Sequence, residues 1–203
     1  MEVEAESMFR QVLEKDPNDL EARMGLADLL FTTGEFQRAS LELQEAARQR
    51  PRDARILEKL GRAYEAQNGY EDALTSYQQA SQLEPESSRH VLASARLYQQ
   101  LGRPEEAKEK FERVLALEVE HAESLEAIGK ILLEEESLKE ASVYLYRASR
   151  ANPDQAEIHE LLGDVRMRLE LFTQAADAYR EATQIDPDRA ATCLLYTSPS
   201  PRD

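Results

Sequence analysis

The sequence predicts an all-α fold of stacked helix–turn–helix repeats, an α-solenoid. The first observation is a period of 34 residues, which runs five times from Leu20 without an insertion or deletion. The second is that the eighth residue of every repeat is small, and the third is that the twenty-fourth is large and apolar. A fixed period in this range indicates a stacked array, because no single unit can bury its own apolar face.

The repeated positions also predict the core. Small residues let helix backbones approach closely, and they occupy position 8 in Ala27, Gly61, Ala95, Gly129 and Gly163. The large residue at position 24 fills the space beside them, in Leu43, Tyr77, Phe111, Leu145 and Tyr179. We therefore predict that the aromatic stripe is core rather than a ligand cage: Tyr64, Tyr77, Tyr98, Phe111 and Tyr179.

Each repeat divides into two predicted helices. The first covers about positions 1–14, for example residues 54–67, and the second about positions 16–30, for example residues 70–83. The turn between them carries Gly34, Asn68-Gly69 or Gly102, residues that accept the positive φ of a helix C-terminus. A Pro-Asp or Pro-Glu pair closes three of the five repeats, because proline cannot donate an amide hydrogen bond.

This spacing resembles the tetratricopeptide repeat over residues 2–192. The resemblance implies a right-handed α-solenoid in which the first helix of each repeat lines a concave groove. It predicts repeats at 20–53, 54–87, 88–121, 122–155 and 156–189. Residues 1–19 align with the second helix of a truncated repeat, and residues 190–192 begin another. We therefore expect an internal piece of a longer array.

The C-terminal segment, residues 193–203, breaks the repeat pattern. It is similar, residue for residue, to a translated sequencing-library adapter, and we interpret it as non-native; the alternative is a genuine Ser/Pro-rich tail. It contains the only cysteine, so the rest of the sequence offers no disulfide or thiol chemistry.

Charge and hydropathy exclude several classes of function. A formal net charge of −15 and an isoelectric point near 4.7 argue against binding to nucleic acid or to an anionic membrane surface. No apolar run reaches the length of a membrane-spanning helix, so we predict no membrane insertion. Residues 1–6 are acidic and lack a signal-peptide core. The cytoplasm is the expected compartment, and the periplasm is the alternative.

Motifs of catalysis and of metal binding are absent from the sequence. His90, His121 and His159 occupy unrelated positions of three repeats, so we predict ordinary surface or interface histidines. The acidic run at 134–136 is interpreted as a solvated turn rather than a metal site. We therefore expect no catalytic residue, no metal and no cofactor.

Two known grooves of the family can be compared with this sequence. Relatives that hold the C-terminal carboxylates of heat-shock chaperones carry Lys and Asn at positions 5 and 9 of one repeat. They add Asn at position 6 of the next, then Lys and Arg at positions 2 and 6 of the third. No three successive repeats match here, and the position-6 asparagine ladder of similar sugar-transferase superhelices is also missing. Both functions are disfavoured.

The resemblance places positions 2, 5, 9, 12 and 13 on the concave side. Repeats two and three carry mainly basic residues there: Arg55, Arg62, Arg89 and Arg96. Repeats four and five carry mainly acidic ones, and our candidates are Glu126, Lys130, Glu160 and Asp164. The pattern predicts a partner with an acidic stretch that becomes basic further along. The alternative is that these are ordinary solvated helix faces.

We therefore predict a non-catalytic protein–protein interaction scaffold that binds a partner peptide or helix. The first alternative is a regulatory or substrate-binding region of an enzyme, such as a glycosyltransferase, kinase or peptidase, whose catalytic domain lies elsewhere. The second is a bacterial envelope-assembly subunit. Uncapped ends also predict self-association, and we expect one apolar edge around Ala175, Tyr179 and Ala182.

Overall fold

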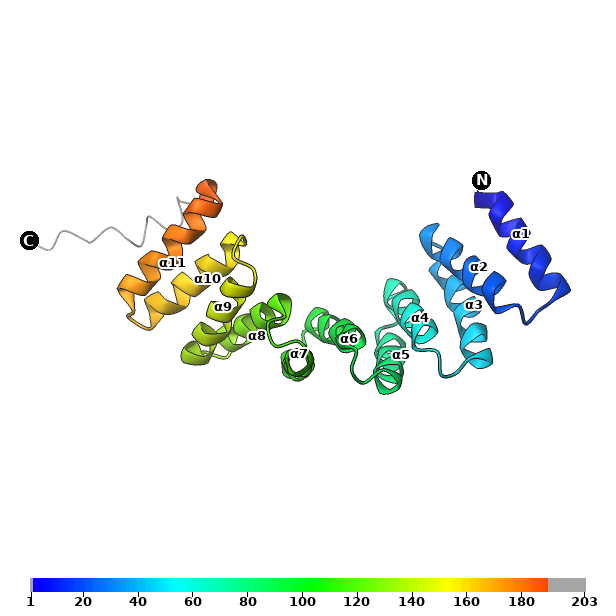
Figure 1. Ribbon diagram of the computed structural model, residues 1–203, viewed down its shortest axis with the longest axis horizontal. Helices are drawn as coiled ribbons and strands as arrows, with labels where there is room; N and C mark the ends of the chain where they lie inside the picture. The colour runs from blue at the N-terminus through cyan, green and yellow to red at the C-terminus, as the bar shows by residue number, and fades with distance from the viewer. Residues whose placement is uncertain (1, 190–203) are drawn as a thin grey trace, which may run out of the picture. The chain divides into compact units, whose positions relative to one another are not determined.

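The computed structural model describes residues 2–189, in which the chain forms eleven α-helices and no strand (Figure 1). The chain divides after Leu101 into two compact units. The predicted all-α class and helical solenoid are confirmed, because helix–turn–helix pairs follow one another and pack against their neighbours within each unit. The adapter-like segment and residues 190–192 lie outside the described residues.

The first unit contains six helices. They are α1 (Glu2–Lys15), α2 (Leu20–Thr32), α3 (Phe36–Gln49), α4 (Ala54–Ala66), α5 (Tyr70–Leu83) and α6 (Ser88–Gln100). Helices α2 and α3 form one antiparallel pair, and α4 and α5 form the next (Figure 1). Helix α1 packs on α2, and α6 packs on α5.

The second unit contains five α-helices and a short 3₁₀ helix in its described part. They are α7 (Pro104–Leu117), α8 (Ala122–Glu134), α9 (Leu138–Ala151), α10 (Ala156–Arg168), α11 (Phe172–Ile185) and η1 (Pro187–Arg189). Helices α8 and α9 form one pair, and α10 and α11 form another. Helix α7 packs on α8, and α9 packs on α10.

Local sequence explains where the helices begin. Asp19 caps α2, since its side chain accepts a hydrogen bond of 2.8 Å from the amide of Ala22. Asp53 caps α4 through the amide of Arg55, at 3.1 Å. Pro104 is the first residue of α7, a position where its missing amide hydrogen costs nothing.

The turns inside the repeats share one left-handed residue. Gly34 and Gly102 adopt positive φ, at 82° and 66°, as predicted. In the second repeat the left-handed residue is Asn68, at 59°, the first of the predicted Asn68-Gly69 pair. Glutamates take the same conformation later, Glu136 at 60° and Glu170 at 61°. The turn geometry is therefore shared by repeats that lack glycine at this place.

The core is built by the predicted small and large positions. A Cβ placed on Gly61 would lie 2.6 Å from Tyr77 Cε1, and one on Gly163 would lie 2.5 Å from Tyr179 Cε1. The helices can approach this closely at these two places only because Gly61 and Gly163 lack a side chain. Tyr77, Phe111 and Tyr179 are buried as predicted, whereas Tyr64 and Tyr98 are only half-buried.

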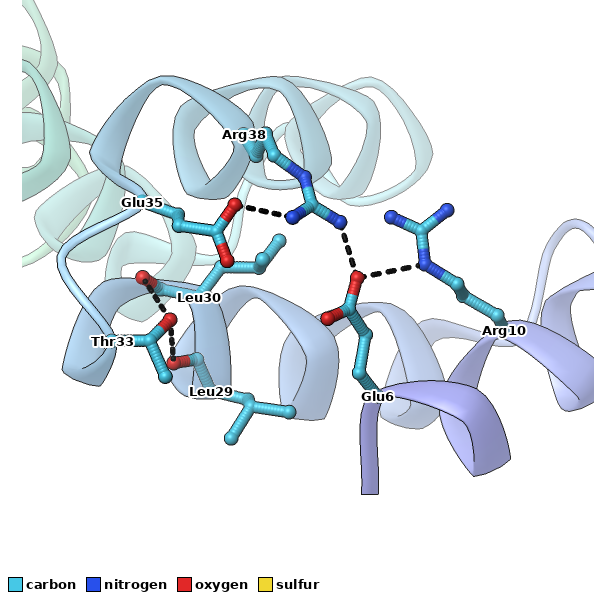
Figure 2. Close-up of polar contacts among 7 residues, drawn as sticks. All are labelled: Glu6, Arg10, Leu29, Leu30, Thr33, Glu35 and Arg38. Carbon is cyan, nitrogen blue, oxygen red and sulfur yellow. Dashed lines mark hydrogen bonds and ion pairs between the residues drawn. The ribbon is translucent and has the colours of Figure 1, made fainter. Parts of the chain in front are cut away.

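A polar cluster ties α1 to the helix pair that follows it. Arg38 of α3 bonds to both Glu35 and Glu6, and Glu6 Oε1 also accepts from Arg10 Nε at 2.9 Å (Figure 2). These hydrogen bonds, first that of Arg38, lower the pKa of the Glu6 carboxyl. In the same region Thr33 Oγ1 donates to the carbonyls of Leu29 and Leu30, both at 3.1 Å (Figure 2).

One predicted apolar edge is wrong. Ala175, Tyr179 and Ala182 are buried, at 0%, 4% and 0% exposure, because the Tyr179 ring lies against Gly163 of α10. The exposed apolar side chains near this helix pair are instead Leu171 and Phe172.

Candidate functional site

The four predicted arginines lie on two helices of the first unit, Arg55 and Arg62 on α4 and Arg89 and Arg96 on α6. All four are exposed. They differ in their bonds. Arg55 binds Asp53 through two hydrogen bonds, Nε to Oδ1 at 3.1 Å and Nη2 to Oδ2 at 2.9 Å. These bonds lower the pKa of the Asp53 carboxyl.

Arg89 is also engaged, by a carboxylate of the preceding repeat. Its Nη1 donates to Glu58 Oε2 of α4 at 3.0 Å. Glu58 is itself only 17% exposed at its side chain, so this pair is partly shielded from water. Because Glu58 neutralises Arg89, the basic character predicted for repeats two and three is weaker than a count of arginines indicates.

Arg62 differs from Arg55 and Arg89. Its guanidinium carbon lies 5.2 Å from the centre of the Phe31 ring, within the range of a cation–π contact. Within residues 2–189 it makes no hydrogen bond and no ion pair. Its N–H donors therefore remain available to a partner.

Arg62 and Phe31 line a small pocket between α2 and α4, with a volume of about 90 Å³. Buried Ala27 and Leu43 form the apolar part of the wall together with Phe31. The charged part consists of Arg62, Asp28 and Lys59.

Asp28 and Lys59 hold each other across the same pocket. Lys59 Nζ donates to both carboxylate oxygens of Asp28, at 2.5 and 2.6 Å. The two residues stand at positions 9 and 6 of successive repeats, and sequence analysis did not pair them. The signal that could have found them is a separation of 31 residues, which also joins Glu58 to Arg89.

The histidines were predicted to be ordinary surface or interface residues, and His90 is of the interface kind, since it contacts Glu58 of α4 and Glu84. His90 is fully buried at the start of α6, with Nε2 3.0 Å from Glu84 Oε2 and Nδ1 3.8 Å from Glu58 Oε2. The reason is its place in the repeat. Position 3 is buried in all five repeats, as Ala22, Ile56, His90, Ser124 and Ile158. The other two histidines are partly exposed, and His121 Nδ1 accepts a hydrogen bond from the amide of Ser124 at 3.2 Å.

In the second unit, Lys130 lies between two carboxylates. Its Nζ is 2.7 Å from Glu126 of the same helix and 2.7 Å from Glu157 of α10. Burial alone would lower the pKa of Lys130, but the bonds from Glu126 and Glu157 outweigh it and raise this pKa. Glu126 also accepts a hydrogen bond from Gln155 Nε2 at 3.2 Å.

The remaining acidic candidates lie on α10. Asp164 is exposed and accepts a hydrogen bond of 2.6 Å from the Tyr179 hydroxyl. Glu160 is half-buried one turn earlier and also has an interaction partner. The structure therefore brings Glu126 and Lys130 together directly, and it places Glu160 and Asp164 on the neighbouring helix of the same unit.

Other chemistry receives no support from the described part of the chain. Between residues 2 and 189 no group of three or more His, Cys, Asp or Glu side chains could hold a metal ion. In the acidic run, Glu135 pairs with Lys108 at 2.9 Å and Glu136 pairs with Arg168. None of the helices from α1 to α11 is both long and apolar enough to cross a membrane.

Comparison with known families and structures agrees with the geometry. Residues 3–63 and 64–131 match one sequence pattern described as a tetratricopeptide repeat, and residues 144–190 match a second. No curated protein is similar enough to the sequence to count as a match.

Several solved structures are similar in fold. One is YrrB, described as a TPR protein with an unusual peptide-binding site: 21% identity, 92% of this chain and 96% of that chain covered, TM-score 0.72. Another is MamA from Desulfovibrio magneticus RS-1: 18% identity, 85% and 97% covered, TM-score 0.72. A third is PilF of Pseudomonas aeruginosa: 27% identity, 88% and 82% covered, TM-score 0.69.

Proposed function

The chain belongs to the tetratricopeptide repeat family, whose repeats form protein-interaction scaffolds, and we propose that it acts without catalysis by binding a partner peptide or helix. The proposed surface comprises the first helices of successive repeats, and its acidic-peptide part lies on α4 and α6. The observation that carries the proposal is Arg62, an exposed arginine with no hydrogen bond or ion pair in residues 2–189.

Charge defines the kind of partner. An arginine fork can bind a carboxylate through two parallel hydrogen bonds, so a partner segment that crosses α4 and α6 is acidic or ends in a carboxylate. Asp164 and Glu160 favour a basic segment on α10. Glu126 on α8 adds to this acidic surface, and like Asp164 and Glu160 it already has an interaction partner.

The test uses peptides selected from a random display library on the whole chain. Binding of these peptides is then measured to the double variant Arg62→Glu/Arg96→Glu over a salt series. We expect affinity to fall by roughly tenfold to a hundredfold, since charged hydrogen bonds contribute about 1.5–3 kcal/mol away from water and about 0–1 on a surface. Added salt should weaken wild-type binding.

The matched control is Arg48→Glu/Arg180→Glu. It makes the same change in net charge on α3 and α11, where these arginines pair with Glu45 and Asp177. If the peptides bind Arg62→Glu/Arg96→Glu and the control equally well, and both keep their helical content, the arginines are ordinary solvated residues of the helix faces.

We also propose self-association through α1. Val12 aligns with Ala46, Ala80, Val114, Ala148 and Ala182, which are all fully buried, yet Val12 is 40% exposed. Met8, one turn earlier on the same face, is 67% exposed. In other repeats the first helix of the same repeat packs on this position, as Leu125 packs on Ala148, and we propose that a second copy covers it on α1.

Sedimentation velocity over a concentration series tests this proposal. We expect the double variant Met8→Gln/Val12→Gln to self-associate more weakly than the wild type. The variant Leu41→Gln, which changes an exposed apolar residue of α3, should associate as the wild type does. A wild-type chain that stays monomeric at the highest concentration would rule the proposal out.

A further inference from the structure

The pocket between α2 and α4 has an apolar wall and a cationic rim, and one short peptide segment can contact both. Its apolar wall is made of Ala27, Leu43 and the ring of Phe31. Its rim carries the guanidinium of Arg62, 5.2 Å from the centre of that ring. Both surfaces belong to the first unit, so the site needs no residue beyond Leu101.

From this arrangement we propose that the pocket is an anchor site for an apolar side chain next to a carboxylate in the partner peptide. The apolar side chain enters between Phe31 and Leu43, and the carboxylate binds Arg62. The inference rests on the proposed function and makes it specific, since it names which dipeptide the groove selects and where that dipeptide lies.

The size of the pocket limits the apolar side chain. A volume of about 90 Å³ accommodates one aliphatic side chain but not a compact ligand of the usual pocket size, roughly 300–1,000 Å³. Burying such a side chain against Ala27 and Leu43 contributes affinity through the hydrophobic effect. The pocket therefore suits a peptide anchor rather than an independent small molecule.

The position of Arg62 determines the charge of the neighbouring residue. The guanidinium is oriented by the Phe31 ring, which leaves its N–H edge free to bind a planar anion. Lys59 adds positive charge at the same rim, but both oxygens of Asp28 already occupy its ammonium group. Arg62 is therefore the first contact for a carboxylate, and Asp28 competes with that carboxylate for Lys59.

This competition gives the proposal a test in which affinity rises. The variant Asp28→Asn removes a like charge from the rim and releases Lys59. We expect it to bind peptides with an apolar–acidic pair several-fold more tightly than the wild type, by about threefold to tenfold. A merely structural role for Asp28 predicts unchanged or weaker binding.

The probe is again the set of peptides enriched from a random display library on the whole chain. We expect enriched peptides to share Leu, Ile, Val or Met beside Asp or Glu. Arg62→Gln should weaken their binding by about tenfold or more, as expected for loss of a charge-assisted pair. Arg62→Lys should recover only part of it, because an ammonium group lacks the planar fork.

Phe31→Leu tests the apolar wall while retaining an apolar side chain at a residue that also packs on the core. It should weaken the binding of peptides that carry the apolar anchor. It should not affect the binding of peptides in which the anchor is replaced by serine. The control variant Arg48→Gln on α3 should bind both kinds of peptide as tightly as the wild type does.

The outcomes separate the pocket from the groove. Enriched peptides that bind Arg62→Gln as tightly as the wild type, or that gain nothing from Asp28→Asn, overturn the anchor site. If the double variant Arg62→Glu/Arg96→Glu still binds those peptides more weakly than the wild type, the anchor site is wrong but the proposed groove is supported. If no peptide is enriched above an unrelated helical protein, both proposals fail.

Discussion

Arg62 of α4 and Lys130 of α8 occupy the same position of their repeats, and their surroundings differ completely. Arg62 lies over an aromatic ring beside a pocket, with no hydrogen bond or ion pair in residues 2–189. Lys130 is held between Glu126 and Glu157 at 2.7 Å each. One unit therefore presents a free cation at position 9, whereas the other uses a cation there as an internal link between two repeats.

The difference shows that a repeat position determines where a side chain lies but not whether it is available. Availability depends on the acids one repeat away, since Glu157 at position 2 of the next repeat captures Lys130. Facing α4, the corresponding position is Arg89, which cannot pair with another arginine and binds Glu58 instead. The same geometry thus frees Arg62 and engages Lys130.

The largest expected difference between Arg62 and Lys130 is in the loss of stability when each charge is reversed. Lys130→Glu would place a third carboxylate between Glu126 and Glu157. We expect the free energy of unfolding to fall by about 2 kcal/mol, between the values for exposed and buried pairs. Arg62→Glu removes only an exposed cation–π contact, for which we expect a loss of about 0.5–1 kcal/mol.

Urea unfolding followed by circular dichroism measures both variants. Equal losses would show that the two cations have the same structural role and would remove the contrast between the units.

The second prediction concerns the core, where we expect the two units to agree. Gly61→Ala and Gly163→Ala each drive a Cβ into a tyrosine ring, at 2.6 and 2.5 Å. Overpacking costs about 1–3 kcal/mol, and alanine recovers about 1 kcal/mol of helix propensity. We expect a net loss of about 1 kcal/mol in both.

A compensating change should restore part of that loss. Tyr77→Leu combined with Gly61→Ala recreates the Ala27 and Leu43 combination of the first repeat, so the double variant should be more stable than the sum of the single effects. Strictly additive losses would argue that ring and glycine do not contact each other.

The third and smallest effect is a dependence on pH. The pKa of Lys130 is raised above its ordinary value of 10.5, so the stabilisation from its ion pairs is complete below that value. It is lost as pH rises through the higher folded pKa. We expect Lys130→Met to lower the free energy of unfolding by about 0.5–1 kcal/mol, which is measured as a lower Tm than that of the wild type. This difference in Tm should shrink above about pH 10.5.

Arg62→Met is the matched comparison for this measurement. A guanidinium stays protonated over the same range, so its difference from the wild type should not change between about pH 8 and pH 12. A parallel change in both variants would point to general alkaline unfolding.

Much of the fold was predictable because it depends on the period alone. The second helix of the second repeat occupies residues 70–83, as predicted, and the first ends at Ala66, one residue before the predicted end. Small residues such as Gly61 were predicted at helix contacts, and they are found there. These features follow from local sequence and from packing against the next helix.

The site was less predictable because its pairs join different repeats. Arg89 was predicted on the basic side of the groove, and its pairing with Glu58, 31 residues away, was not predicted. His90 was predicted to be an ordinary surface or interface histidine, and Ile56 and Ile158 at the same position favoured the buried interface. Aligning the repeats column by column would have found His90. Such an alignment could not have found the pocket at Phe31, because the pocket depends on how Arg62 lies over the Phe31 ring.

The turns at Glu136 and Glu170 have a consequence for recognising arrays of this kind. Both glutamates adopt a left-handed backbone that usually selects glycine, and the helix pairs on either side still form. A search that demands glycine between the two helices would therefore detect the first three repeats and overlook the last two. Counting units by the buried alanine near the start of the second helix, such as Ala141 and Ala175, would detect all five.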